Sequence, residues 1–544
     1  MTKKLKTQNS SRFIRDKFKD KKILVVGLAR SGVGSANLLS SFGAKVSVTD
    51  VKSYDFLADD IKKLSPSVKV IAGGHPEDIF SNSDLIVVSP GVPPDIPPLI
   101  HAKEKGIPVI GELELAYQIV MSYELRVTSK IQNAEHAARN TQHATPAFIG
   151  ITGTNGKSTT TILIDLMLKR AGFKTLLAGN IGNAITEELY KIIRGQSTTH
   201  GGAGVRDEES LALPLDYLVT EISSFQLESI KDFRPFVALI LNITPDHLNR
   251  YRSMEEYIDA KANIFKNQGA DDYLILNADD PVIMNLYNSK LKTQNSKLRN
   301  INVFFFSLKT EVQGIYYKNG RLLSNLLSTP GTTPSGFLRK GFVPPLSIAA
   351  ADEIKIRGVH NLENSMAASL AALICGCSAE TIRDVLKDFS GLEHRLEFVC
   401  EIDGVTFIND SKGTNVGAVV KSLEGIKNTV LIMGGRDKDG DFTVLKDLVK
   451  KKVKALVLLG EAKEKIAKAL EGAADTVFVK DIKEAVEMSM SKASAGDVVL
   501  LSPGCASFDM FADFEDRGRR FKEAVVEIQN LRCKMQDARC KIKN

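Results

Sequence analysis

Short runs of β-branched and other apolar residues alternate with helix-length segments over nearly all of this chain. The alternation is typical of parallel α/β sheets, because a helix must return the chain to the start of each next strand. The runs predicted as strands form three groups: Lys22–Val26, Lys45–Thr49 and Leu85–Ser89; Phe148–Thr152, Thr175–Ala178, Tyr217–Glu221, Val237–Asn242 and Tyr273–Asn277; Val430–Met433, Ala455–Leu459, Thr476–Val479 and Val498–Leu501. At roughly 100–200 residues per domain, the length allows about three domains. We therefore predict an α/β protein with domains over 1–120, 147–391 and 392–530, a linker over 121–146 and a tail over 531–544.

Polar stretches interrupt this pattern and look like insertions. They are Met121–Thr145, Gly195–Leu213, Asn288–Asn300 and Ser324–Leu346. The hexapeptide Leu-Lys-Thr-Gln-Asn-Ser occurs twice, at Leu5–Ser10 and Leu291–Ser296, without the length or apolar positions of a structural repeat. We predict that Met121–Thr145 and Asn288–Asn300 are surface segments.

The net charge of +7 lies in the two tails. Residues 1–22 carry nine Lys/Arg and two Asp, and residues 531–544 carry five Lys/Arg and one Asp, so the middle of the chain has a net charge of −4. Charge confined to termini favours solvated tails over a nucleic-acid site, although a basic arm stays an alternative. We predict no nucleic-acid partner.

Cysteine usage and hydropathy indicate the compartment. Six cysteines do not form a disulfide framework, and Cys375-Gly-Cys377 lacks the second pair that a zinc site needs. No apolar run reaches the ~18–20 residues that span a bilayer, and no signal-peptide core follows the basic N-terminus. We predict reduced thiols, no zinc, no transmembrane segment and a cytoplasmic location.

The strongest chemical signal is the segment Ile151-Thr-Gly-Thr-Asn-Gly-Lys-Ser-Thr159, between a predicted strand and a predicted helix. Such a turn directs backbone N–H groups and a helix N-terminus at a phosphate, while Lys157 adds positive charge and Ser158 offers a hydroxyl to Mg²⁺. It is a variant of the P-loop, since Ile151 stands where the strict pattern has glycine. The candidate nucleotide-binding residues are Gly153, Thr154, Asn155, Gly156, Lys157, Ser158 and Thr159.

Polar side chains end two other predicted strands of the second group. Glu221 ends one, and Asp246-His247 follows another. Ligands of open α/β sheets bind at this edge, and hard oxygen ligands there suit Mg²⁺ beside nucleotide phosphates. A helix N-cap at Asp246 with an exposed histidine is the alternative.

A second glycine-rich turn, Gly27-Leu-Ala-Arg-Ser-Gly-Val-Gly34, follows the first predicted strand, and Asp50 ends the next one. The layout is Rossmann-like and raises the possibility of a dinucleotide site. Ala29 in place of the middle glycine disfavours it.

These motifs resemble the ATP-dependent Mur ligases, relatives of folylpolyglutamate synthase, and the chain from about Lys22 to Phe521 is most similar to the members that add D-glutamate. The resemblance implies a Rossmann-like N-terminal domain that binds UDP, a central P-loop-type ATPase domain with a mostly parallel sheet, and a Rossmann-like C-terminal domain. It also implies an ADP-forming ligase of peptidoglycan synthesis that joins D-glutamate to UDP-N-acetylmuramoyl-L-alanine through an acyl phosphate, using ATP and Mg²⁺, most simply as a monomer.

The resemblance also implies roles for individual residues. Catalytic roles fall on Lys157, Glu221, His247, Lys261 and Lys412, and metal binding on Ser158, Glu221, His247 and a carbamylated Lys261. Further ATP contacts fall on Asn361, Asn364, Arg395 and Asp410, with both asparagine amides facing one way. Substrate contacts fall on Ser31, Asp50, Ser89 and Asn180 for the UDP substrate, and on Thr414, Lys438, Ser507 and Phe514 for D-glutamate.

Several alternatives stay open. Another Mur-type ligase would add a different amino acid, although the Asp-Asn-Pro-Arg motif of the diaminopimelate-adding members is absent. Folylpolyglutamate synthase lacks the N-terminal domain. A dehydrogenase, disfavoured by Ala29, and an inactive binding module, disfavoured by the set of catalytic residues, are alternatives of other classes. The spacing of Phe508, Phe511 and Phe514 also fits a buried helix face without any ligand.

Overall fold

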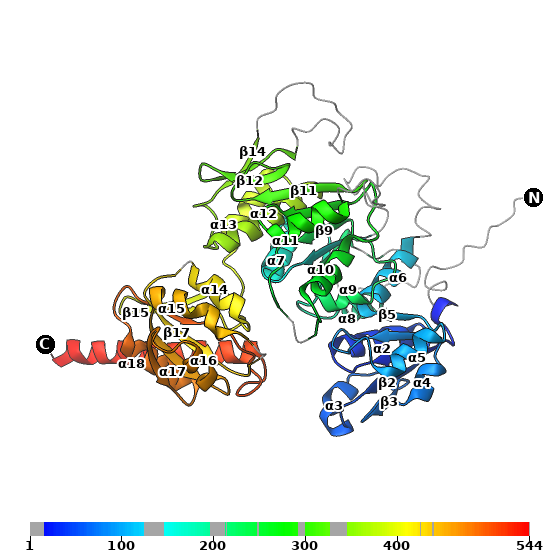
Figure 1. Cartoon of the computed structure of the whole chain (residues 1–544), viewed down its shortest axis with the longest axis horizontal. Coiled ribbons are helices and arrows are strands. Elements are labelled where there is room, and N and C mark those ends of the chain that lie inside the picture. The colour runs from blue at the N-terminus through cyan, green and yellow to red at the C-terminus, as the bar shows by residue number, and fades with distance from the viewer. Residues whose placement is uncertain are drawn as a thin grey trace, which may run out of the picture. The chain divides into compact units, whose positions relative to one another are not determined.

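The structure of the chain is a computed structural model, shown in Figure 1. It describes residues 16–124, 146–195, 213, 215–246, 250–291, 300–326, 345–424, 426–437 and 440–542. Three mostly parallel sheets with helices between their strands confirm the predicted α/β class. Across these ranges, no helix has both the length and the apolar character needed to cross a membrane.

The first sheet is parallel, with the strand order β3-β2-β1-β4-β5. Its strands are β1 (Lys22–Val26), β2 (Lys45–Asp50), β3 (Lys69–Ala72), β4 (Leu85–Val88) and β5 (Val109–Gly111), and its helices are α2 (Arg30–Ser41), α3 (Tyr54–Ile61), α4 (Glu77–Ser81), α5 (Pro97–Glu104) and α6 (Glu112–Glu124). The order reverses between β1 and β4, and ligands of open α/β sheets bind at such a switch point. The turns after β1 and β4, at Gly27 and Ser89, border this point.

The second sheet has nine strands in the order β14-β13-β12-β11-β10-β9-β6-β8-β7. Its strands are β6 (Ala147–Thr152), β7 (Thr175–Gly179), β8 (Tyr217–Glu221), β9 (Val237–Ile240), β10 (Tyr273–Asn277), β11 (Asn302–Ser307), β12 (Gly314–Lys318), β13 (Arg321–Ser324) and β14 (Leu346–Ala350). Strand β6 lies between β8 and β9 and parallel to both, with Ile151 opposite Glu221. The predicted phosphate loop and the predicted acidic strand end are therefore neighbours.

Helices lie between the strands of this second sheet, and two more follow its last strand. They are α7 (Lys157–Arg170), α8 (Ile185–Ile193), α9 (Ser224–Glu228), α10 (Met254–Ala262), η1 (Asn263–Phe265), α11 (Pro281–Leu286), η2 (Tyr287–Leu291), α12 (Val359–Ile374) and α13 (Ala379–Asp388). One continuous hydrophobic core links this part to the first sheet, because side chains of α2 and α6 pack with those of α8.

The third sheet has the order β15-β16-β20-β17-β18-β19, with only β15 antiparallel to its neighbour. Its strands are β15 (Glu397–Ile402), β16 (Val405–Asn409), β17 (Thr429–Gly434), β18 (Val453–Leu459), β19 (Asp475–Phe478) and β20 (Val498–Leu501). Its helices are α14 (Val416–Glu424), η4 (Phe442–Leu445), α15 (Lys446–Lys452), α16 (Lys463–Ala469), α17 (Ile482–Lys492) and α18 (Phe514–Ile542). Apolar clusters cover both faces of this sheet.

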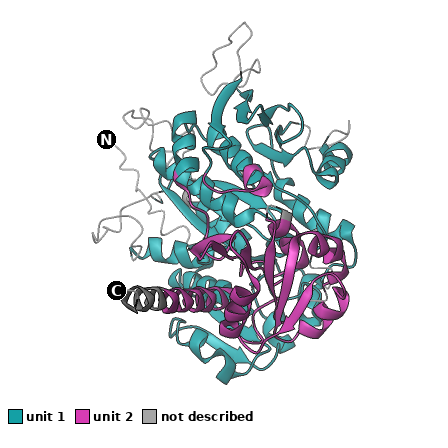
Figure 2. Cartoon of the chain, turned by 90° about the vertical axis from the view of Figure 1, so that its left-hand side faces the viewer, with its two compact units in different colours: residues 1–354, 363–387 teal, residues 355–362, 388–544 magenta. Residues whose placement is uncertain are grey.

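The chain divides into two compact units, coloured separately in Figure 2. The first unit comprises residues 1–354 and 363–387 and holds the first two sheets, while the second comprises 355–362 and 388–544 and holds the third. The exact domain boundaries stay a prediction.

The predicted strands are all present, with ends that differ by one or two residues. The predicted insertions fall largely outside the described residues, which omit 125–145, 196–212, 292–299 and 327–344. Where their ends are described, two corrections follow. Met121 to Glu124 continue helix α6, with Ser122 buried, and Leu291 at the end of η2 is buried as well. Apolar packing thus reaches into segments predicted to lie wholly on the surface.

Candidate active site

The loop between β6 and α7 forms an anion cradle. Gly153 and Gly156 both have positive φ, and helix α7 begins at Lys157 directly after the turn. The backbone N–H groups in the first turn of a helix lack intrahelical acceptors, and the helix dipole favours negative charge there. This part of the chain can therefore hold phosphate oxygens with backbone groups.

A turn after β9 fixes the shape of the loop. The side-chain amide of Asn242 accepts from the N–H of Asn155 at 2.7 Å and donates to its carbonyl at 3.0 Å. The Thr154 hydroxyl donates to the carbonyl of Thr244 at 3.1 Å, and the Thr154 N–H donates to the Asn242 carbonyl at 2.9 Å. Because one side-chain amide binds both the N–H and the carbonyl of Asn155, the cradle is preorganised.

Gly156 cannot be replaced without strain. Its φ is +84°, and a Cβ there would lie 2.2 Å from Oδ1 of Asn364. Asn364 is buried on α12, and the Thr160 hydroxyl donates to its Oδ1 at 3.3 Å. The predicted proximity of Asn364 to the nucleotide loop thus has a structural basis.

We expect Gly156→Ala to lower the free energy of unfolding by about 1–3 kcal/mol, since an alanine there is strained and displaces Asn364. Affinity for ATP should fall as well. Gly172→Ala is the matched control, because Gly172 has φ +91° just beyond the other end of α7 and open space around a Cβ. It should cost about 1 kcal/mol and leave ATP affinity intact. Urea denaturation and calorimetric titration measure the two effects, and equal ATP affinity in both variants would contradict the expectation.

Hard oxygen atoms gather beside the loop. The hydroxyl of Ser158 donates to Oε2 of the buried Glu221 at 2.5 Å, and the exposed Asn180 donates to Oε1 at 3.1 Å. A carboxylate and a hydroxyl next to a phosphate cradle form a donor set that suits Mg²⁺. Within the described residues, no group of three or more His, Cys, Asp or Glu has the arrangement of a metal site, and the predicted ligand His247 lies outside those residues.

Lys261, on α10, is buried with only 2% of its surface exposed, and its Nζ donates to the carbonyl of Gly153 at 2.9 Å. The Lys157 Nζ donates to the same carbonyl and to that of Thr154, both at 2.9 Å. Burial and, after it, the charge of Lys157 hold the pKa of Lys261 well below its usual value, while Asp246 opposes the shift. Two lysines therefore meet at one loop carbonyl, and burial disfavours the charged form of Lys261.

The residues predicted to bind the UDP substrate border the switch point of the first sheet. The Asp50 carboxylate accepts from the N–H groups of Leu28 at 2.7 Å and Lys52 at 2.9 Å. The hydroxyl of the buried Ser89 donates to the carbonyl of Gly27 at 2.8 Å. Both side chains thus shape the turn after β1, and Ser31 opens the following helix.

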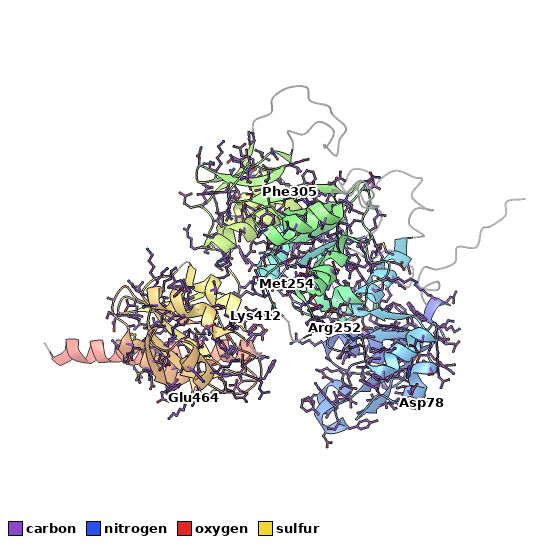
Figure 3. The ribbon with its side chains drawn as sticks, viewed as in Figure 1. Asp78, Arg252, Met254, Phe305, Lys412 and Glu464 are labelled. Carbon is purple, nitrogen blue, oxygen red and sulfur yellow. The ribbon has the colours of Figure 1, made fainter. Side chains whose placement is uncertain are left out.

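The predicted residues of the second unit form a group around Asp410. Its buried carboxylate accepts from the hydroxyls of Ser422 at 2.7 Å and Ser502 at 2.8 Å. Burial raises the pKa of Asp410 to about 6, although these hydrogen bonds and the charge of Arg395 oppose the rise. The Lys412 Nζ lies 3.6 Å from the centre of the Phe514 ring, and Lys412 is labelled in Figure 3.

The turn after β20 is held by a residue that was not predicted. Arg517 is buried and donates to the carbonyls of Ser411, Cys505 and Ala506 and to the Ser411 hydroxyl. An arginine that follows a buried strand and a glycine-containing turn carries no sequence signal that singles it out. The structure also corrects the aromatic helix face, because Phe508 is 63% exposed and both it and Phe511 precede α18.

The structure brings the predicted residues together in three groups, and Lys438 lies outside the described residues. Hydrogen bonds join the loop 153–159 to Glu221 and Lys261, and Glu221 to Asn180, while Asn364 packs against Gly156. Asp50 and Ser89 both bind the turn after β1, and Ser31 follows that turn. In the second unit, the charge of Arg395 acts on Asp410, Lys412 contacts Thr414 and Phe514, and Ser507 is buried in the turn after β20. Helix α12 begins at Val359, so Asn361 and Asn364 lie three residues apart on one helix, as the sequence predicts. The Asn361 amide donates to the carbonyl of Arg357 at 2.8 Å, and a shared role of the two asparagines at one site stays a prediction.

Family models match most of the chain. They are the "Mur ligase MurD-like, N-terminal domain" over residues 21–111, the "Mur ligase middle domain" over 151–372 and the "Mur ligase, glutamate ligase domain" over 394–505. A UDP-N-acetylmuramoylalanine--D-glutamate ligase from Geotalea uraniireducens is 42% identical over 94% of this chain and 98% of its own length. One from Clostridioides difficile is 40% identical over 94% of this chain and 99% of its own. The chain belongs to the Mur ligase family.

Solved structures support the fold of this Mur ligase. MurC from Thermotoga maritima superposes with a TM-score of 0.51 at 17% identity over 93% of this chain and 99% of that one. MurF from Thermotoga maritima, solved in complex with ADP, gives 0.51 at 14% identity over 95% and 97%. Like its family, the chain is an ATP-dependent, ADP-forming ligase.

Proposed function

We propose that this Mur ligase joins D-glutamate to UDP-N-acetylmuramoyl-L-alanine in the synthesis of peptidoglycan precursors. The observation that carries the proposal is the similarity to D-glutamate ligases, which extends over 94% of the chain at about 40% identity and includes all three parts of the fold. The anion cradle and its oxygen donors support the ATP half of the reaction. Because ATP and UDP-linked sugars are its substrates, we assign the reaction to the cytoplasm, and a monomer is the simplest assembly.

The reaction needs an activated carboxyl group, because a free carboxylate is a poor acylating agent. The terminal carboxylate of the alanine attacks the γ-phosphorus of ATP; the new O–P bond forms as the bond to the β-phosphate oxygen breaks, and ADP leaves. The amine of D-glutamate then attacks the acyl carbon. A C–N bond forms, the nitrogen loses a proton, and phosphate leaves with the electrons of the broken C–O bond.

The cradle supplies electrostatic stabilisation of the transferring phosphoryl group. Backbone N–H groups at the start of α7, over residues 156–159, are proposed to bind the phosphates, and the Lys157 ammonium lies on the same loop to offset the negative charge. Asn242 holds the peptide of Asn155 in place, so little reorganisation is needed when ATP binds. Arg395, Asn361 and Asp410 are further proposed ATP contacts, with Asp410 acting through the shape of its turn since its carboxylate is already bound by two serines.

The donor set fits Mg²⁺, with Ser158, Glu221, His247 and Lys261 as the proposed ligands. Bound there, the ion supplies Lewis-acid stabilisation of phosphate charge. Glu221 is kept in place by Asn180, which donates to its other oxygen.

Lys261 can serve as a metal ligand only after modification. A neutral amine attacks CO₂, a C–N bond forms, and loss of a proton leaves a carbamate with two oxygen donors. The burial of Lys261 beside a second lysine favours this, because it disfavours the ammonium form. We therefore propose that Lys261 is carbamylated.

The second unit is proposed to bind the amino acid. Thr414, Lys438, Ser507 and Phe514 are the proposed D-glutamate contacts, and Lys412 is proposed to act near the transferred phosphate. Lys412 already lies against Phe514, so both belong to one local group.

Phosphate release tests the proposal directly. With UDP-N-acetylmuramoyl-L-alanine and ATP present, we expect turnover with D-glutamate and at least ~10²-fold less with L-glutamate, L-lysine or diaminopimelate, since unpaired buried polar groups strongly reject a wrong amino acid. Equal or faster turnover with another amino acid would identify a Mur ligase with a different acceptor. Absence of turnover with all four would overturn the assignment.

A further inference from the structure

Two glutamates in the first turn of α6 have no role in the proposed function. Glu112 and Glu114 are 2% and 0% exposed, although carboxylates are rarely buried so deeply without a partner. Both follow the last strand of the first sheet, and both accept hydrogen bonds from the part of the chain that carries the phosphate loop. Their partners differ.

Glu112 caps helix α8. Its Oε1 accepts from the backbone N–H of Thr186 at 3.1 Å and from the Thr186 hydroxyl at 3.0 Å, and its carboxylate also accepts from the N–H of Ile185. Ala184, at the N-cap of α8, has no side-chain acceptor. A glutamate distant in sequence therefore supplies the cap that the helix lacks, at the end where the dipole favours a negative charge.

Burial raises the pKa of Glu112, and interactions with the backbone N–H of Thr186 and the hydroxyl of Ser31 oppose the rise. Ser31 lies in the first turn of α2, at the switch point of the first sheet, and is a proposed contact for the UDP substrate. Glu112 is thus a shared acceptor for a substrate-binding turn and for a helix of the second sheet.

The segment before α8 is part of the same arrangement. It begins with Asn180, another proposed substrate contact, and the Arg30 guanidinium donates to the carbonyl of Gly182 at 3.4 Å. Helices α2 and α8 approach so closely that a Cβ on Gly34 would lie 2.7 Å from the Thr186 hydroxyl and from the N–H nitrogen of Glu187. Ser31 lies in the first turn of α2, and the segment that begins with Asn180 leads into α8. The two helices pack closely, and the Glu112 carboxylate contacts both.

We propose that Glu112 is a positioning residue for the UDP-linked substrate. It fixes the Ser31 hydroxyl relative to the start of α8 and to the segment that begins with Asn180. Through these contacts it sets the position of the uridine diphosphate relative to the phosphate loop. The inference rests on the proposed function for the identity of the substrate. It predicts that loss of the carboxylate weakens binding of the UDP moiety more than it weakens the fold.

Glu114 provides the matched control. Its carboxylate accepts from the N–H groups of Lys231, Asp232 and Phe233 at 2.9–3.0 Å, so it also ties α6 to the second sheet's part of the chain. It lies on the same turn of the same helix and is as deeply buried. Within the part of the chain that the structure describes, the hydrogen bonds of Glu114 reach Gln118 and residues 231–233, and none of these is a proposed substrate contact.

The test compares Glu112→Gln with Glu114→Gln in the full chain. Calorimetric titration with UDP should show about tenfold weaker binding for Glu112→Gln, the effect of a loosened hydrogen bond on a substrate contact, and unchanged binding for Glu114→Gln. In steady state, Glu112→Gln should raise KM for UDP-N-acetylmuramoyl-L-alanine by a similar factor with KM for ATP unchanged. Equal losses of UDP affinity in both variants would show that Glu112 only stabilises the packing of α6, and would overturn the inference.

A second comparison guards against a folding defect. Because Glu112 is inferred to act through Ser31, the double variant Ser31→Ala/Glu112→Gln should bind UDP no more weakly than Ser31→Ala alone. Additive losses would contradict the inference. A wild-type chain that binds UDP but shows no turnover with UDP-N-acetylmuramoyl-L-alanine would refute the proposed function, while the UDP affinities of the variants still decide the role of Glu112. A wild-type chain that does not bind UDP would overturn both.

Discussion

Lys157→Ala is expected to lower turnover by about 10²–10³-fold, the usual effect of removing one preorganised group that stabilises a transition state. The Lys157 Nζ is bound to two carbonyls of the phosphate loop, Gly153 and Thr154, so it already lies on the cradle that is proposed to receive ATP. The change should affect the fold little, because it also removes a positive charge that faces the buried Lys261. Steady-state phosphate release and the thermal midpoint measure the two effects.

Lys169→Ala is the control for this prediction. Lys169 lies in the last turn of the same helix, α7, and its half-exposed side chain binds Asp165 at 2.9 Å. Its loss should leave turnover at the wild-type level, since Lys169 lies at the far end of α7 from the phosphate loop and the buried Asp165 keeps its hydrogen bond from the Thr175 hydroxyl. Lys157→Arg should recover only part of the activity, because a planar guanidinium does not replace a compact ammonium within the loop. Turnover within tenfold of wild type for Lys157→Ala would show that the loop is not the catalytic phosphate site.

The buried parallel strands could be predicted from the sequence because a strand covered on both faces is a continuous apolar run. Eight strands of the structure were not predicted, and four of them, β12, β13, β15 and β16, carried a local signal. Asn319-Gly320 joins β12 to β13 and Asp403-Gly404 joins β15 to β16, and all four residues have positive φ as in a type I′ turn. Asn-Gly and Asp-Gly are the strongest short-range hairpin signals. The apolar pattern of the partly exposed β15 was too weak to mark a strand without that turn.

The phosphate loop could be predicted because its chemistry is encoded in consecutive residues. The groups that shape it could not, since they depend on tertiary contacts. Asn242, in the turn after β9, hydrogen-bonds the loop at Asn155. Asn364, which packs against Gly156, lies on α12, more than two hundred residues further along the chain. Asp50 and Ser89 were predicted as substrate contacts from the family resemblance, and that role stays a prediction. Their side chains are bound to the turn after β1, a contact that only the tertiary structure reveals.

Substitution of Lys261 should separate activity from stability. Lys261→Met keeps the length of the side chain and removes the amine, so neither a carbamate nor a metal contact can form there. We expect turnover to fall by about 10²-fold or more, the scale of lost metal-ion stabilisation of phosphate charge. The thermal midpoint should stay the same or rise, because a buried amine beside Lys157 is replaced by an apolar side chain of similar volume.

Bicarbonate distinguishes carbamylation from a purely electrostatic role of the lysine. Wild-type turnover should fall in CO₂-depleted buffer and recover when bicarbonate is added, whereas Lys261→Met should respond to neither. Lys266→Met is the control, since Lys266 follows five residues later, donates to the carbonyl of Ile230 at 2.6 Å and has its pKa lowered by burial as well. That variant should retain both turnover and the bicarbonate response. Lys266 binds the carbonyl of Ile230, whereas Lys261 binds the Gly153 carbonyl of the phosphate loop. Wild-type activity that is indifferent to CO₂, together with a mass spectrum lacking the added carboxyl group on Lys261 under saturating bicarbonate, would rule out the carbamate and leave Lys261 as a hydrogen-bond donor to Gly153.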